Sequence, residues 1–374
     1  MNVSLYFHIP FCSQKCPYCH FYSLRNCQNL QDIFKKSLRI EWQRRLPFLA
    51  KQKIVSIYFG GGTPTLLAPQ GIADILEFIH RSDLIIDPDC EITIEANPEK
   101  IDLPLLMQLK QMGINRISLG VQSLDDSSLQ ELGRIHNAQK AIDAIFNAHQ
   151  AGFTNISIDL MYDLPHQNES SWKTTLDRLS NLPITHCSLY NLTIEPNTLF
   201  FQKKETLRKS MPDPDQSLRL LQMGVERFES LGYHRYEISA FAKNGMISRH
   251  NSGYWTGRPF LGYGPSAFSY WEGSRFKNIA HLHRYAQALA ADQNIIEFTE
   301  KLPYPADVNE LFAIRLRLFD GVKENEWPLP EETIANLHQL QNDGFLEYQN
   351  GCWKLTDRGI LFYDTVAENI ISDI

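Results

Sequence analysis

The chain has 374 residues, of which 43% are hydrophobic and 21% are charged, and its formal net charge is −7. The length exceeds that of one small domain and the composition is typical of a soluble globular protein, so we expect one large α/β domain and a smaller one. The negative charge argues against nucleic acid as a main partner. The sequence contains no apolar run of about 18 residues, so we expect no membrane-spanning helix.

The N-terminal stretch, MNVSLYFHIPF, is apolar but short. It has no basic lead-in, and His8 and Pro10 interrupt it, so it does not resemble a signal peptide. We therefore expect a cytoplasmic protein, and the sequence leaves peripheral contact with a membrane open.

Up to about residue 230, short apolar runs alternate with helical patterns. Runs rich in β-branched and aromatic residues predict strands at 4–9, 55–61, 90–98, 116–122, 155–162 and 186–194. The patterns between them predict helices at 30–46, 70–80, 103–112, 138–150 and 169–180. Gly113 and Gly152 follow two of these patterns, as helix C-caps do. Six such units, where eight would close a barrel, predict an incomplete, open (β/α)6 parallel barrel over residues 1–232.

The pattern changes after residue 232. Residues 233–302 are rich in aromatic residues, Gly and His, and we interpret them as a connecting segment. Residues 303–374 begin with a helical region and end in the order helix, strand, turn, strand, which predicts a winged-helix-like domain. In an acidic protein such a domain is interpreted as a packing module and not as a DNA reader.

Three of the seven cysteines follow the first predicted strand within eight residues: Cys12, Cys16 and Cys19. A cluster of thiols in a reducing compartment indicates metal binding or catalysis. One compact loop with three thiolates suits an iron–sulfur cluster that leaves one iron open to another ligand. A zinc site completed by His8 or His20 remains an alternative, and Cys27 is a doubtful fourth ligand.

Polar residues stand at the carboxyl ends of the other predicted strands, where parallel α/β folds bind ligands. The second strand ends in a glycine turn, GGGTPT, which allows close backbone approach to a ligand. Glu95, Gln122 and Asp159 mark the next three strands, and Arg134 follows the fourth strand. This mixture of donors and acceptors suits a zwitterionic, nucleotide-like ligand.

The motifs LYFHIPFCSQKCPYCHFYS, FGGGTPT, IEANP, RISLGVQS and IDLMYDLP are similar, in order and spacing, to the oxygen-independent coproporphyrinogen III oxidase family within the radical S-adenosylmethionine (SAM) superfamily. The resemblance covers nearly the whole chain. It implies that Cys12, Cys16 and Cys19 hold a [4Fe–4S] cluster. It also implies a set of residues that contact SAM: Tyr6, Tyr18, Gly61, Gly62, Thr63, Glu95, Gln122, Arg134 and Asp159. An electron donor such as a flavodoxin or ferredoxin, and a homodimer, are expectations of the same kind.

Three features resemble the HemW-like heme-chaperone branch of this family more than the oxidase. Phe21 stands where the oxidase carries a further cysteine, the first strand begins near Met1 without the oxidase's N-terminal extension, and HNSGYW matches the branch's HNxxYW motif. The motif implies that His250 is an axial ligand of heme iron, and that Tyr254 and Trp255 form the walls of its site, with Asn251 beside them.

The resemblance therefore predicts a chaperone that carries heme as cargo and delivers it to hemoproteins, including membrane-associated ones. The alternatives are radical oxidative decarboxylation of porphyrinogen propionates and a zinc-stabilised interaction protein. Catalysis stays open, because a chaperone can use a cluster for regulation or dimer formation. His20, where many relatives have Asp, has no predicted role.

Overall fold

The computed structural model describes residues 1–371. Its main element is a twelve-stranded sheet, and the six strands at its centre are mutually parallel in the order β1, β4, β5, β6, β7, β8. These strands are β1 (Asn2–Ile9), β4 (Lys53–Gly61), β5 (Ile85–Ala96), β6 (Arg116–Gln122), β7 (Asn155–Tyr162) and β8 (His186–Asn191). The predicted open six-unit barrel is therefore confirmed. Strand β5 starts earlier than predicted, because Ile85 and Ile86 already pair with β4.

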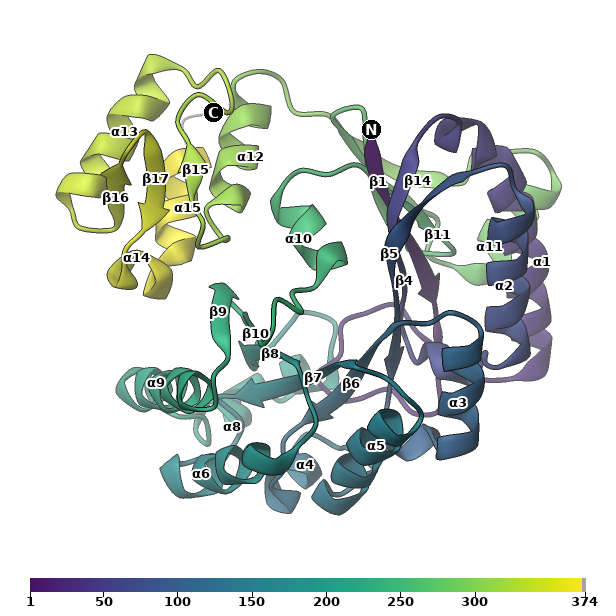
Figure 1. The fold of residues 1–374 in the computed structure, drawn as a ribbon, viewed down its shortest axis with the longest axis horizontal. Coiled ribbons are helices and arrows are strands. Elements are labelled where there is room, and N and C mark those ends of the chain that lie inside the picture. The colour runs from purple at the N-terminus through teal and green to yellow at the C-terminus, as the bar shows by residue number, and fades with distance from the viewer. Residues whose placement is uncertain (372–374) are drawn as a thin grey trace.

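Helices cover the convex side of this sheet (Figure 1). They are α1 (Gln28–Arg45), α2 (Gln70–Arg81), α3 (Leu103–Gln111), α4 (Asp126–Glu131), α5 (Ala138–Gln150), α6 (Glu169–Arg178) and α9 (Pro214–Ser230). In β1, Leu5 and Phe7 belong to the apolar core, whereas Ser4, Tyr6 and His8 alternate with them. Because side chains alternate along a strand, the polar set faces the concave side. The concave side is thus the face available for a polar site.

Residues 233–302 lengthen the sheet at both edges. Strands β9 (His234–Glu237) and β10 (Ala240–Ala242) are antiparallel and extend the β8 edge. At the other edge β11 (Phe260–Tyr263) is parallel to β1, and β12 (Phe268–Trp271), β13 (Ser274–Asn278) and β14 (Ile296–Glu300) follow as an antiparallel meander. Helix α11 (Leu282–Ala290) separates the last two strands. The segment interpreted from sequence as a connection is therefore built into the sheet; the domain boundaries themselves stay predictions.

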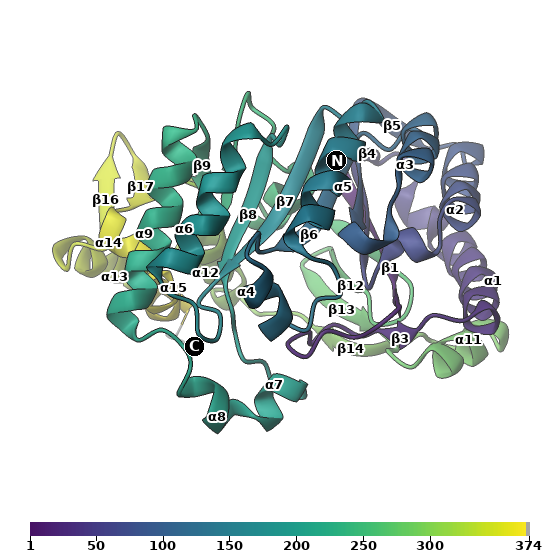
Figure 2. The ribbon, with the colours of Figure 1, turned by 90° about the horizontal axis from the view of Figure 1, so that it is seen from below.

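Helix α10 (Arg249–Trp255) carries the HNSGYW sequence and lies on the concave side of the sheet (Figure 1). It begins at Ser248, whose hydroxyl accepts a hydrogen bond from the backbone N–H of Asn251. The short helices α7 (Leu199–Gln202) and α8 (Lys204–Arg208) project from the barrel near the carboxyl ends of its strands (Figure 2).

The C-terminal residues form their own small core. Helix α12 (Ala306–Arg315) leads to a three-stranded sheet of β15 (Val322–Lys323), β17 (Cys352–Leu355) and β16 (Leu346–Gln349), which packs with α13 (Glu331–Asn342), α14 (Asp357–Leu361) and α15 (Tyr363–Ile371). The predicted order of helix, strand, turn and strand is present. The Arg317 guanidinium lies 4.2 Å from the ring centre of Trp255 and 3.4 Å from a Glu237 carboxylate oxygen, which ties this part to the barrel. Within residues 1–371 no helix is long and apolar enough to cross a membrane.

Candidate functional site

The cysteine loop follows the carboxyl end of β1 and is held by backbone and histidine hydrogen bonds. The short strands β2 (Phe11–Cys12) and β3 (Leu24–Arg25) pair at its base. His8 bonds the Tyr22 carbonyl through Nε2 at 3.0 Å and the Tyr6 hydroxyl through Nδ1 at 3.1 Å. Burial lowers the pKa of His8 to about 4, so its imidazole is neutral. Both ring nitrogens are engaged, so His8 positions the loop and is not free to bind a metal.

All three loop thiols line one cavity of about 170 Å³ at the carboxyl ends of the parallel strands. All the residues predicted to contact the cluster or SAM line this cavity except Tyr6: Cys12, Cys16, Tyr18, Cys19, Gly61, Gly62, Thr63, Glu95, Gln122, Arg134 and Asp159. Tyr6 lies behind it, with its hydroxyl bonded to His8 and its ring stacked on Tyr58 at 6.1 Å. Cys27 is exposed and stands at the N-cap position of α1, outside the cavity.

The donor set fits an iron–sulfur cluster better than a single metal ion. Among residues 1–371, no three His, Cys, Asp or Glu side chains are gathered closely enough to hold one ion. Thiolates on a cluster bind separate irons and therefore stand further apart than the ligands of a single zinc. Burial raises the pKa values of Cys12 and Cys19, so burial favours their protonated form, and a bound metal centre would favour the thiolate.

The glycine turn after β4 brings the backbone against this loop. A Cβ on Gly62 would come within 2.6 Å of the Phe11 carbonyl oxygen, and Gly61 has a φ of +106°. A side chain at either position would push the loop out of place. Thr63, which follows, accepts a hydrogen bond from Asn97 at 3.0 Å and has its hydroxyl 3.9 Å from the Cys12 sulfur.

Two carboxyl groups face the cavity from neighbouring parts of the barrel. Glu95 accepts hydrogen bonds from the Tyr58 hydroxyl at 2.8 Å and from the Gly61 N–H at 3.2 Å. Burial raises the pKa of Glu95 to about 7, and the nearby Asp159 adds to that rise. Burial also raises the pKa of Asp159 to about 6, although Arg116 opposes the rise. Near neutral pH these groups can accept hydrogen bonds from a bound ligand and retain a share of protons.

Gln122 and Arg134 complete the polar lining. Gln122 has a φ of +66° next to a break in the β6–β7 register, and its side-chain oxygen accepts a hydrogen bond from Tyr190 at 2.9 Å. Such a left-handed conformation is costly for a residue with a side chain and is found preferentially at functional sites. Arg134 donates to Gly120 and Asn97 at 2.8 Å and lies 3.4 Å from the Cys16 sulfur. It therefore links the cysteine loop to the strand ends.

Sequence reasoning missed several lining residues, among them Asn97, Ser118 and Tyr190. Ser118 has a sequence signal, since it lies four residues before the predicted Gln122 in β6, a spacing that places both side chains on one face of a strand. Asn97 belongs to the IEANP motif, immediately after the strand. Tyr190 lies on β8, whose residues were not assigned to the site.

A second cavity of about 390 Å³ adjoins the first and shares Tyr18, Glu95 and Asp159 with it. Asn251 of α10 lines it. Phe21 lines both cavities with 53% of its surface exposed, and His20 stacks on it with ring centres 4.5 Å apart. His20 therefore lies at the rim and not among the loop thiols.

The side chains of the HNSGYW sequence do not share one site: one is buried against the sheet and others line a cavity. His250 is 1% exposed, and its ring nitrogens bond the Ser56 hydroxyl at 3.0 Å and the Tyr254 hydroxyl at 2.9 Å. Tyr254 and Trp255 line a separate cavity beside α12. The heme roles predicted for these three residues stay predictions.

Comparisons with known proteins agree with this geometry. The Radical SAM superfamily model matches residues 6–179, and the HemN C-terminal domain model matches residues 303–362. Heme chaperone HemW of Escherichia coli (strain K12) is 32% identical over 388 residues, which cover 99% of this chain and 98% of that protein. Heme chaperone HemW of Bacillus subtilis (strain 168) is 31% identical, covering 87% of this chain and 86% of that protein.

A solved structure gives the same result for the fold. The coproporphyrinogen III oxidase HemN from Escherichia coli has a TM-score of 0.87 and 25% identity, covering 100% of this chain and 91% of that chain. Membership of the superfamily implies a [4Fe–4S] cluster and SAM. The chain belongs to the radical SAM superfamily and, within the coproporphyrinogen III oxidase family, to the branch that contains the HemW proteins.

Proposed function

We propose that this protein is a heme chaperone that carries a [4Fe–4S] cluster with SAM and delivers heme to hemoproteins. The observation that carries the proposal is similarity to proteins named heme chaperone HemW along nearly the whole chain. The residue at position 21 supports it, because a phenylalanine lines the cavity where the oxidase family has a further cysteine. Recipients that include membrane-associated hemoproteins, a flavodoxin or ferredoxin as electron donor, and a homodimer belong to the same proposal.

In this proposal Cys12, Cys16 and Cys19 bind the cluster, whose chemistry when bound is one-electron reduction of the SAM sulfonium. The remaining cavity residues bind and orient SAM. The Glu95 carboxylate accepts hydrogen bonds from the polar groups of SAM, and the Gln122 amide can accept or donate them. Arg134 offers its guanidinium to the carboxylate of SAM. The glycine turn leaves room for the nucleotide against bare backbone.

The affinity for SAM should depend on pH through Glu95. Since its pKa is raised to about 7, the ionised fraction grows as pH rises through that value. We expect the SAM dissociation constant to fall by about 5- to 10-fold between about pH 6 and about pH 8, because only the ionised carboxylate accepts with both oxygens. Isothermal titration of reconstituted protein measures this.

The Glu95→Gln variant is the matched comparison, since it keeps the shape and cannot ionise. Its SAM affinity should be weaker than that of the wild type at about pH 8, and its pH profile should be nearly flat above the range in which Asp159 titrates. An unchanged slope in the variant would show that another group controls the pH dependence.

The oxidase is the second candidate, favoured by the likeness to the HemN structure. The second cavity argues against it. Within residues 1–371 its lining includes no lysine or arginine, while Glu195 adds a carboxylate. Coproporphyrinogen carries four propionates, and a site for them needs cationic partners.

An anaerobic assay separates the two candidates. Reconstituted protein is incubated with SAM, a reductant and coproporphyrinogen III, and the porphyrins are analysed after oxidation. We expect no protoporphyrin from this incubation and a Soret band when heme is added to the same preparation. Formation of protoporphyrinogen at catalytic turnover would instead establish the oxidase.

A further inference from the structure

Beneath the cavity of the cysteines, the inside of the barrel is filled by a closed layer of side chains. Each member stands two positions before a residue that lines this cavity or the adjoining one, and the members come from four neighbouring strands: Thr93, Arg116, Ser157 and His186. That spacing puts both side chains of each pair on one face of their strand, with about 7 Å between them. The four residues, which we call the buried layer, are each at most 1% exposed.

Arg116 is the one charged member of the buried layer, and it has no counter-ion. Burial lowers the pKa of His186 well below its usual value, so that imidazole is neutral. Within residues 1–371 the Arg116 guanidinium forms no ion pair. Its Nη2 lies 3.4 Å from Nδ1 of His186, a nitrogen that already bonds the Ser157 hydroxyl at 2.8 Å. Its Nε is buried and has no partner. An unpaired buried charge is costly for a fold and calls for a functional explanation.

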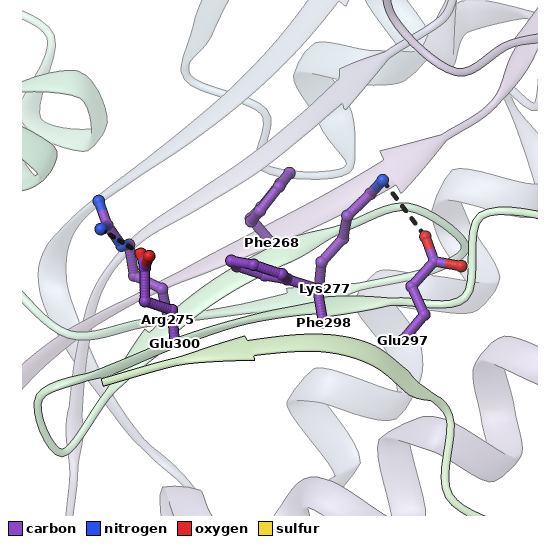
Figure 3. A pocket seen from close by; sticks show the side chains of 6 residues that line it. All are labelled: Phe268, Arg275, Lys277, Glu297, Phe298 and Glu300. Carbon is purple, nitrogen blue, oxygen red and sulfur yellow. Dashed lines mark hydrogen bonds and ion pairs between the residues drawn. The ribbon is translucent and has the colours of Figure 1, made fainter. Parts of the chain in front are cut away.

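Other arginines of the chain show the usual arrangement. Arg45, which is also buried, pairs with Glu41 at 3.3 Å. On the outer strands β13 and β14, Arg275 pairs with Glu300 (Figure 3). The fold thus provides a carboxylate where an arginine has a structural role, and Arg116 departs from this arrangement.

The charge of Arg116 acts on the two carboxyl groups of the SAM site. Burial raises the pKa of Glu95 to about 7 and that of Asp159 to about 6, and Arg116 opposes the rise in both. A nearby positive charge favours the ionised form of a carboxyl group. Arg116 itself lines neither of the two adjoining cavities, so it acts from behind the site and not by touching a ligand there.

The other titratable side chains that interact with these carboxyl groups do not duplicate this effect. They are Tyr6, Tyr58, Cys187, Tyr190, Tyr254 and Arg134. Burial raises the pKa of the four tyrosines and of the thiol, so these groups are uncharged near neutral pH. Arg134 lines the cavity and lies 3.4 Å from the Cys16 sulfur, so its charge belongs to the site itself.

We propose that Arg116 is a positioning residue for SAM binding: its buried guanidinium holds Glu95 and Asp159 in the ionised form that accepts hydrogen bonds from the ligand. This inference rests on the proposed binding of SAM in the cavity and adds the residue that controls the charge of its two carboxyl groups. It gives a reason for keeping an unpaired cation in the buried layer, because the interaction that compensates the charge lies in the site above.

Calorimetric titration of the reconstituted full chain with SAM, from about pH 6 to about pH 9, tests this role in Arg116→Met. The variant keeps the length of the side chain and removes its charge. Loss of the cation should raise the pH at which the carboxyl groups ionise by about one unit. We therefore expect SAM to bind about 5-fold more weakly than in the wild type at about pH 7, and with nearly equal affinity at about pH 9. Arg116→Lys should restore most of the wild-type profile.

Thermal unfolding of the same proteins without SAM separates a positioning role from a purely structural one. Methionine removes a buried charge that has no partner, so Arg116→Met should unfold at the wild-type temperature or above it. A residue needed only for folding would lower the unfolding temperature and reduce the SAM affinity by the same factor at every pH. That pair of results would overturn the inference.

Arg275→Met is the matched control. It removes the same charge from a side chain that is 39% exposed and, like its partner Glu300, does not line the cavity of the cysteines. It should leave the SAM affinity and its pH profile unchanged. A wild-type profile in Arg116→Met would refute the role of Arg116 alone. A reconstituted wild type that holds iron and binds no SAM at any pH would instead refute the proposed function of the site.

Discussion

Replacing Cys16 with alanine should bring the iron and sulfide content of the purified protein from about four of each per chain to near zero. The three loop thiols face one cavity, and among residues 1–371 no fourth thiol lines it, since the exposed Cys27 lies outside. The brown absorbance of anaerobically purified protein should disappear. Iron and sulfide analysis and anaerobic absorption spectra measure both effects.

The matched control is Cys27→Ala, which removes a thiol close in sequence but directed to solvent. It should keep the wild-type iron content. A Cys16→Ala protein with full iron content, or one zinc per chain in the wild type, would contradict the cluster assignment. Circular dichroism spectra of both variants, compared with that of the wild type, report whether each of them folds.

Replacing Glu41 with alanine should lower the free energy of unfolding by about 3–5 kcal/mol. Glu41 is fully buried and accepts hydrogen bonds from the Gly264 N–H and the Asn278 side chain at 2.7 Å each, and from the Tyr285 hydroxyl. It also pairs with the buried Arg45 at 3.3 Å. The alanine leaves that guanidinium and three donors without their carboxylate, at the place where α1 holds the β11–β13 extension of the sheet.

The matched control is Glu77→Ala, which breaks a pair with Arg81 on the solvent side of α2, where the carboxylate is 54% exposed. Its effect should stay below about 0.5 kcal/mol. Urea unfolding followed by circular dichroism compares the midpoints of both variants with the wild type. Equal midpoints for the two variants would mean that the buried network does not stabilise the sheet extension.

The sequence predicted the parts of the fold in which local signals agree with the packing. The six parallel strands are apolar runs, and Gly113 and Gly152, with φ values of +94° and +93°, end helices as expected. The outer strands escaped prediction because their residues are mixed: β13 is Ser-Arg-Phe-Lys-Asn, and it becomes a strand through pairing with β12 and β14. Tertiary pairing, not intrinsic propensity, determines such a segment.

The same distinction holds for the site. Glu95, Gln122 and Asp159 could be placed together because parallel strands end at one edge. Tyr6 lies two residues before His8 on the polar face of β1, further from the carboxyl end of the strand. Its side chain therefore contacts His8 and His250 and does not line the cavity of the cysteines. The burial of His250 depends on α10 lying against β4, a contact between distant segments that no local pattern encodes. Nothing in the structure explains the choice of His20.

The measurement that tests the central claim most directly is the rate at which the heme-loaded protein transfers heme to a recipient. Stopped-flow absorption follows transfer to the apo form of a b-type cytochrome at increasing acceptor concentration, and transfer to apomyoglobin gives the rate of passive release. If the protein is a chaperone, the rate of heme transfer to the cytochrome should exceed the rate of passive release and should rise with acceptor concentration, because heme is transferred within a complex of the two proteins. A rate that equals passive release and does not change with acceptor concentration would contradict the chaperone function.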